Sequence, residues 1–200
     1  MANFASNVLP KFGIKFKAQK MVLTILLAVG GGIVVALLLL TIFLPNRIQY
    51  IETIIVQAPI SKVYDAIRFQ EQLMDWSAWP TETKSECLVK NTDGIIGAQT
   101  VYSKNGKEFG YQEVTGLTEN EQVDFYLKSY VAPFEDDVRL SFILKELPDK
   151  RTEVSLWFNE LLKKPHFLIA YFGGIIKWVH RMHLKDLSGL KQYVETRNSL

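Results

Sequence analysis

Apolar and polar residues form three successive patterns along this chain. From Met21 to Leu44 the sequence is apolar and carries no charge. The segment "RIQYIETIIV" then alternates with the period of two that is typical of a strand. A period of 3.6 comes next in "PISKVYDAIRF", where Pro59 suits a first helical turn. We expect a second short helix, "QEQLMDW", to run into Trp76 and Trp79 and to be stopped by Pro80.

The period of two returns after these helices, with clear turn signals. Asn105-Gly106 predicts a tight hairpin, and Pro148-Asp149 predicts another. Together these segments predict about six antiparallel strands. A helical period then resumes after Pro165 and continues to Val194. Gly173-Gly174 either breaks this helix or permits a close backbone approach, and we favour the break.

This order predicts an α+β fold in which a curved antiparallel sheet wraps around a long C-terminal helix. We expect three parts: a basic leader at 1–20, a transmembrane helix at 21–44 and a domain at 45–200. At about 1.5 Å per residue, the apolar run exceeds the roughly 30 Å hydrocarbon core of a bilayer. It is longer than the apolar core of a cleaved signal peptide, and a buried soluble helix rarely lacks charge on every face.

Charges beside the apolar run predict its orientation. Four lysines precede it and only Arg47 lies close behind, so the N-terminus is expected in the cytoplasm. The C-terminal domain then faces the periplasm or the exterior if the cell is bacterial. The lysines concerned are Lys11, Lys15, Lys17 and Lys20.

Net charge changes once the leader is set aside. The whole chain carries +2, but all 21 acidic residues lie after position 44, with 19 of the 23 Lys and Arg residues, so that part carries −2. We therefore expect no nucleic-acid partner. Cys87 is the single cysteine, which excludes an internal disulfide and a cysteine-rich metal site.

Three segments resemble the START-like or helix-grip superfamily (SRPBCC), in particular polyketide cyclase/dehydrase-type members with an N-terminal membrane anchor. They are the strand-to-helix opening "IETIIVQAPISKVYDAI", the tryptophan segment "MDWSAWP" and the strand start "DGIIGAQTVYS". Their order and spacing, over about residues 48–195, carry the resemblance. The chain departs from the pattern in the wider spacing of Gly94 and Gly97, and in Leu156, where a tryptophan is expected, with Trp157 on the opposite face.

The resemblance implies a cavity between sheet and terminal helix that holds a lipid or another hydrophobic small molecule. We expect no cofactor. Enzyme activity of the cyclase or aromatase type on a hydrophobic substrate remains an alternative, as does a structural or interaction module with a filled cavity. The side chains expected to contact the ligand are Trp76, Trp79, Tyr102, Tyr111, Phe125, Phe142, Leu156, Phe158, Glu160, Phe172 and Ile176.

Candidate polar chemistry is sparse. Strand alternation directs Asp124 and Arg139 to solvent, whereas Glu160 shares the phase of Phe158 and is the best polar candidate for the cavity. Glu113 is a similar candidate. His180, His183 and Asp186 have the spacing H-x-x-H-x-x-D, which metal sites use, but we favour ordinary surface or membrane-facing histidines and expect no metal.

Aromatic residues cluster in the Trp76/Trp79 segment and on the predicted terminal helix. We expect one ring of the Trp76/Trp79 pair to close the core and the other to line the cavity, with core packing of both or a membrane-interface role as alternatives. On the terminal helix, aromatic and basic residues mix in a way that fits either a membrane-contacting surface or a solvated basic face. These are Phe167, Tyr171, Phe172 and Trp178 with Lys163, Lys164, Lys177 and Arg181.

Overall fold

The computed structural model describes residues 9–131, 138–164 and 167–198, and divides the chain into two compact units, Met1–Pro45 and Asn46–Leu200. In its described part, the first unit contains one helix, α1 (Leu9–Phe43), which continues without a break through the lysine-rich segment. Within it, Gln19–Phe43 is largely exposed and is long and apolar enough to cross a membrane by length and composition.

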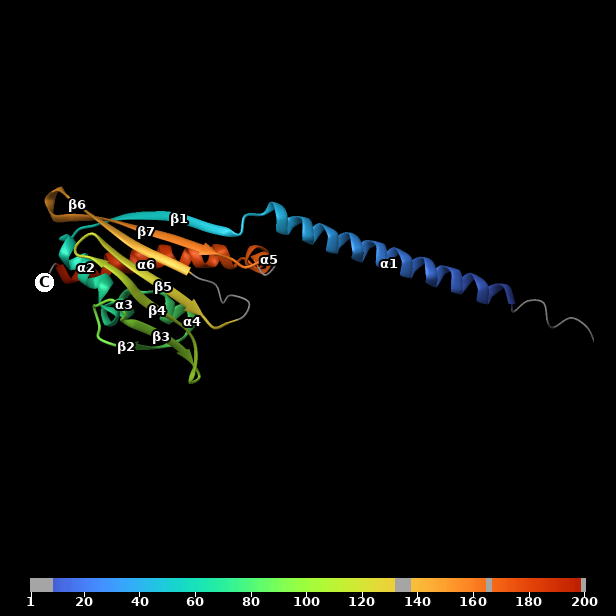
Figure 1. The fold of residues 1–200 in the computed structure, drawn as a ribbon, viewed down its shortest axis with the longest axis horizontal. Helices are drawn as coiled ribbons and strands as arrows, with labels where there is room; N and C mark the ends of the chain where they lie inside the picture. Colours follow the sequence, from blue (N-terminus) through green and yellow to red (C-terminus); the bar gives the residue numbers. More distant parts are fainter. Residues whose placement is uncertain (1–8, 132–137, 165–166, 199–200) are drawn as a thin grey trace, which may run out of the picture. The chain divides into compact units, whose positions relative to one another are not determined.

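The second unit is an α+β domain with one seven-stranded antiparallel sheet in the order β1-β7-β6-β5-β4-β3-β2. The sheet curves around the C-terminal helix α6 (Figure 1). The predicted helix-grip architecture is therefore confirmed. In chain order, its elements are β1 (Arg47–Val56), α2 (Ile60–Arg68), α3 (Gln70–Trp76), α4 (Trp79–Thr83), β2 (Glu86–Lys90), β3 (Gln99–Lys104), β4 (Lys107–Thr118), β5 (Gln122–Ser129), β6 (Val138–Leu147), the 3-10 turn η1 (Pro148–Lys150), β7 (Arg151–Leu161), α5 (Phe167–Phe172) and α6 (Ile175–Asn198).

Both predicted hairpins form at their turn signals. Asn105 and Gly106 connect β3 to β4 and have φ of 52° and 73°. Two successive positive φ values suit a tight hairpin, because they match the right-handed twist of the flanking strands. The β6–β7 hairpin turns at Pro148–Lys150. Strand alternation is also confirmed on β7, where Leu156 is buried and pairs with Phe142, whereas Trp157 lies on the opposite face.

The tryptophan segment differs from the prediction. Helix α3 ends at Trp76, and Pro80 lies in the first turn of α4 instead of stopping α3. The missing N–H of a proline is harmless at this position and its fixed φ suits a helix start. The two tryptophans therefore belong to different helices, separated by Ser77 and Ala78.

Gly173-Gly174 breaks the terminal helix, as predicted, and separates α5 from α6. Gly174 has φ of 72°, in the left-handed region that a glycine enters without steric cost. Gly173 N–H still donates to the Ile169 carbonyl at 2.8 Å, so this carbonyl keeps a helical partner at the end of α5.

Gly94, the first glycine of "DGIIGAQTVYS", has a local structural role. A Cβ atom on Gly94 would lie 2.3 Å from the Phe69 ring, and Gly94 has φ of 74°. The preceding residue, Asp93, accepts hydrogen bonds from the backbone N–H groups of Gln70 and Glu71 at 2.7 and 3.1 Å. Asp93 thus caps the start of α3 from a distant loop, and Gly94 lets that loop approach α2 and α3.

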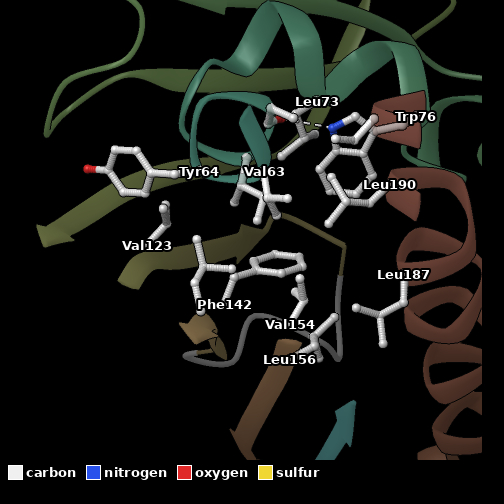
Figure 2. Close-up of a cluster of buried hydrophobic side chains, with 14 of the residues drawn as sticks. Val63, Tyr64, Leu73, Trp76, Val123, Phe142, Val154, Leu156, Leu187 and Leu190 are labelled. Atoms are coloured by element: carbon white, nitrogen blue, oxygen red, sulfur yellow. Dashed lines mark hydrogen bonds between the residues drawn. The ribbon is translucent and has the colours of Figure 1, made fainter. Parts of the chain in front are cut away.

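The core lies between the concave face of the sheet and helices α2, α3 and α6. Figure 2 shows Trp76 packed near Leu73 and Leu190, with Phe142 and Leu156 of the sheet below. The indole Nε1–H of Trp76 donates to the Ala66 carbonyl at 2.9 Å. Ala66 lies in the last turn of α2, where carbonyls have no partner within the helix, so this bond satisfies a buried acceptor.

Candidate ligand cavity

A cavity of about 250 Å³ lies between the sheet and the α5–α6 segment. Its walls come from β5, β6 and the end of β7, from Trp79 of α4 and from one side of the broken C-terminal helix. Most of its surface is apolar. The lining residues are Trp79, Leu127, Lys128, Ser129, Val138, Phe158, Glu160, Leu162, Ala170, Ile175, Ile176, Trp178, Val179 and His183.

A second hollow of about 160 Å³ lies nearer to β3 and β4. It is lined by Tyr102, Phe109 and Gln112, among others, and it shares Trp79, Leu127 and Ser129 with the larger cavity. Trp79 therefore forms part of the wall of both spaces. Its ring contacts Trp178 edge to face, with ring centroids 5.3 Å apart, which supports it from the α6 side.

The two tryptophans thus have different environments. Trp76 is 6% exposed and belongs to the core cluster. Trp79 is half-buried and lines the cavity. The Ser77–Ala78 connection produces this difference, because it ends the first helix before the second begins.

His183 places a polar group against the cavity. It is fully buried, contrary to the expected surface position, and its Nδ1 lies 2.7 Å from the Tyr50 hydroxyl. Burial, and to a smaller extent His180, lower the pKa of His183 from 6.5 to about 3, so the imidazole is neutral near pH 7. Its other nitrogen, Nε2, is buried and has no hydrogen-bond partner among the described residues.

Tyr50 remains a neutral phenol. Burial raises its pKa, and the negative charges of Glu160, Glu52 and Asp186 raise it further. The ring of Tyr50 stacks on Phe158 with centroids 5.0 Å apart, and His183 lies 4.8 Å from the same Phe158 ring. The Tyr50–His183 pair thus packs against the Phe158 ring.

Asp186, one helical turn after His183, has a structural role. It is 4% exposed and accepts hydrogen bonds from Ala78 N–H at 2.7 Å and Ser77 Oγ at 3.1 Å. Burial raises its pKa from 3.8 to about 7, although these hydrogen bonds act in the opposite direction. Asp186 therefore fixes the connection that precedes Trp79.

Within the described residues, no group of three His, Cys, Asp or Glu side chains has a geometry that could hold a metal ion. The three residues of the H-x-x-H-x-x-D pattern are instead directed to different partners. His180 Nε2 pairs with Glu52 at 2.7 Å, His183 with Tyr50, and Asp186 with the Ser77–Ala78 connection.

The structure divides the predicted contact residues into four groups. Trp79, Phe158, Glu160 and Ile176 line the larger cavity, and Tyr102 and Tyr111 line the smaller hollow. Trp76, Phe125, Phe142 and Leu156 belong to the packed core. Phe172 is 70% exposed and lies at the surface. Glu113 accepts a hydrogen bond from Gln99 Nε2 at 2.7 Å.

Sequence reasoning missed His183 as a cavity residue. A signal was present, because His183 lies four residues after Val179 and four before Leu187, in the predicted apolar stripe. Polarity alone suggests a surface position. Leu127 and Val138 were also missed, and register shows that they pair with each other on the inner face of the sheet.

Comparison with solved structures supports the fold. No family model and no curated protein matches the sequence. The chain is similar to a structure from Nitrosospira multiformis, with a TM-score of 0.57, 16% identity and coverage of 76% of this chain and 100% of the other. A structure from Chromobacterium violaceum has a TM-score of 0.55 and 17% identity, with coverage of 76% of this chain and 99% of the other. The structure of Ara h 8.0201 has a TM-score of 0.52 and 13% identity, with coverage of 75% of this chain and 99% of the other. At these identities the likeness shows the helix-grip fold.

Proposed function

We propose that this protein is a membrane-anchored, START-like domain that binds a lipid or another hydrophobic small molecule in the cavity between sheet and α6. The observation that carries the proposal is the cavity itself, of about 250 Å³, with mostly apolar walls beside the packed core of the domain. Cavities of this kind favour apolar ligands, since each buried CH₂ group contributes about 0.8 kcal/mol relative to water.

The α5 segment supports an approach to the cavity from a lipid surface. Ala170 of α5 lines the cavity, whereas Ile169 and Phe172 on the same helix are exposed, as is Leu161 at the end of β7. Three exposed lysines lie in neighbouring positions of the chain: Lys163 and Lys164 precede α5, and Lys177 lies in the first turn of α6. Apolar side chains flanked by lysines are typical of surfaces that contact anionic lipid.

The point where the chain enters the domain supports the same location. Asn46 and Leu162 are joined by two backbone-directed hydrogen bonds, of 2.8 and 3.0 Å, and Leu162 lines the cavity. Only Leu44 and Pro45 separate Asn46 from Phe43, the last residue of α1, a reach of at most about 10 Å. An anchor at Gln19–Phe43 would therefore tether the domain to the membrane through Asn46. The lysine bias favours a cytoplasmic N-terminus.

An enzymatic role is supported less well by the same groups. A general base works best with a pKa near the working pH, and the pKa of His183, at about 3, is far below neutrality. Asp186 has a pKa of about 7, but its carboxylate is engaged by Ser77 and Ala78 and is not among the residues that line the cavity. These groups favour binding over acid–base catalysis.

Filling the cavity tests the proposal. In the full chain reconstituted in lipid nanodiscs, Ala170→Phe should place a ring in the cavity and abolish binding of a fluorescent apolar dye. The matched control is Ile169→Phe, one residue away on the exposed side of α5, which should retain binding. Equal dye binding by both variants and the wild type would contradict the proposed site.

A further inference from the structure

A ligand that leaves a bilayer for this cavity gains little hydrophobic free energy, because lipid tails are already apolar. Selectivity must then arise from shape and from polar contacts. The apolar walls offer few polar groups, and among the described residues that line the cavity only His183 has a buried side-chain atom without a partner, its Nε2. A buried polar atom without a partner carries a desolvation cost that a suitable ligand removes.

The Tyr50–His183 hydrogen bond indicates which of the two imidazole nitrogens carries the proton. A neutral imidazole has one donor and one acceptor nitrogen, and a phenol has a single proton to donate. If Tyr50 donates to Nδ1, the proton of the imidazole is on Nε2, and only the Nε2–H group lacks a partner. If Nδ1–H donates instead, both the phenol proton and Nε2 lack partners. The first arrangement is the better satisfied, so Nε2–H is a hydrogen-bond donor.

The charges around the cavity restrict the ligand further. Two charged sheet residues line the cavity, Glu160 and Lys128; register pairs Glu160 with Val138 and Ile48, and Lys128 with Tyr111. Glu160 and Asp186 both lie close enough to raise the pKa of Tyr50. An anionic ligand group beside His183 would be repelled by the carboxylate of Glu160.

We propose that His183 makes the cavity selective for a neutral, largely hydrocarbon molecule with one oxygen acceptor, such as a ketone, an ester or an alcohol. This inference rests on the proposed function. The Nε2–H group donates to the ligand oxygen, and Tyr50 holds the imidazole in the required tautomer. The hydrocarbon part of the ligand packs between Phe158, Ile176 and Val179.

Ligand contact with Nε2 requires a change in the cavity wall. Neighbouring side chains cover this nitrogen, so a ligand reaches it only after part of the wall moves. The Trp79 ring lies 6.0 Å from the His183 ring and is half-buried, and it lines both hollows.

The test uses the full chain in lipid nanodiscs and four ten-carbon probes: decane, 2-decanone, 1-decanol and decanoate. Affinities are measured by competition with a fluorescent apolar dye and referred to the probe concentration in the lipid, determined in nanodiscs without protein. The ketone and the alcohol should bind on the order of tenfold more tightly than decane. Decanoate should bind no more tightly than decane.

Two substitutions assign the preference to His183. His183→Leu should retain decane binding and lose the preference for oxygen-bearing probes. His180→Gln, on the same helix but partly exposed and paired with Glu52, should keep it. Should His183→Leu not fold, imidazole ¹⁵N NMR of the wild type replaces it: 2-decanone should shift the His183 Nε2 resonance and leave His180 unchanged.

Two outcomes would overturn the inference, and they differ in their meaning. Equal binding of decane and 2-decanone, or a ketone preference that survives in His183→Leu, would overturn the role of His183 and leave apolar-ligand binding intact. Failure of all four probes to bind would overturn both proposals.

Discussion

At the scale of single residues, two tryptophans three positions apart have different roles because the chain leaves one helix between them and begins another. Trp76 ends a helix and donates a buried hydrogen bond to Ala66, whereas Trp79 begins the next helix and lines the cavity. Trp76→Phe leaves the Ala66 carbonyl unpaired, which should lower the free energy of unfolding by about 1–3 kcal/mol.

The matched change Trp79→Phe should cost less stability, since Trp79 is half-buried, and should alter ligand binding instead. For a chain of this size, the loss in Trp76→Phe corresponds to a decrease in melting temperature of roughly 2–4 °C per kcal/mol. Differential scanning calorimetry measures both variants. An equal decrease in both would contradict the separate roles.

His183 and Asp186 should affect stability with opposite pH dependences. The pKa of His183 is lowered on folding, from 6.5 to about 3, so its contribution to stability is present above pH 6.5 and is lost as the pH falls. The pKa of Asp186 is raised, from 3.8 to about 7, so its contribution is present below pH 3.8 and is lost as the pH rises through 7. Between pH 3.8 and 6.5 the two effects oppose each other.

Single substitutions should separate these effects. Relative to wild type, the free energy of unfolding of Asp186→Asn should increase with pH between 3.8 and 6.5, whereas that of His183→Gln should decrease. Tyr50, His180 and Glu160 stay in place in both variants, so each difference from wild type isolates the substituted group. Urea unfolding at several pH values measures both slopes, and slopes of the same sign would contradict the assigned pKa shifts.

At the scale of elements, the packing of α6 against α3 depends on Gly189. A Cβ atom at this position would lie 2.2 Å from the Trp76 carbonyl oxygen. Glycine to alanine in a helix normally stabilises by about 1 kcal/mol, but here the helices must move apart. We expect Gly189→Ala to lower the free energy of unfolding by about 1–3 kcal/mol. The control Ser188→Ala, at an exposed neighbouring position, should change it by less than about 0.5 kcal/mol.

Elements with a local signal were predictable from the sequence. The Asn105-Gly106 turn, the alternation on β7 and the helix break at Gly173-Gly174 each depend on residues next to one another in the chain. Helix ends that depend on distant residues were not predictable in this way. Asp93 caps the start of α3, and Asp186 holds the start of α4. The cavity depends on how far the sheet curves around α6, which strand phase does not specify. Phase alone therefore places Phe125 and Phe142 in the cavity, although they fill the core.

At the scale of the whole molecule, the proposed function requires α1 to be an uncleaved anchor. We expect the chain to remain in the membrane fraction after alkaline carbonate extraction, with the intact mass of the full chain. The double substitution Gly31→Arg and Val34→Arg should release it, because an arginine at the centre of a span costs about 2.5–3.5 kcal/mol. A mature chain that lacks the apolar run would identify this run as a cleaved signal sequence and would contradict the anchor.

Ligand binding is tested most directly by native mass spectrometry, with solvent extraction, of the full chain purified from its membrane. We predict an apolar molecule bound at a ratio of one to one, retained by Ile169→Phe and lost from Ala170→Phe. Wild-type protein that carries no such molecule, and takes none up from a lipid mixture, would contradict the proposal that this cavity is a binding site.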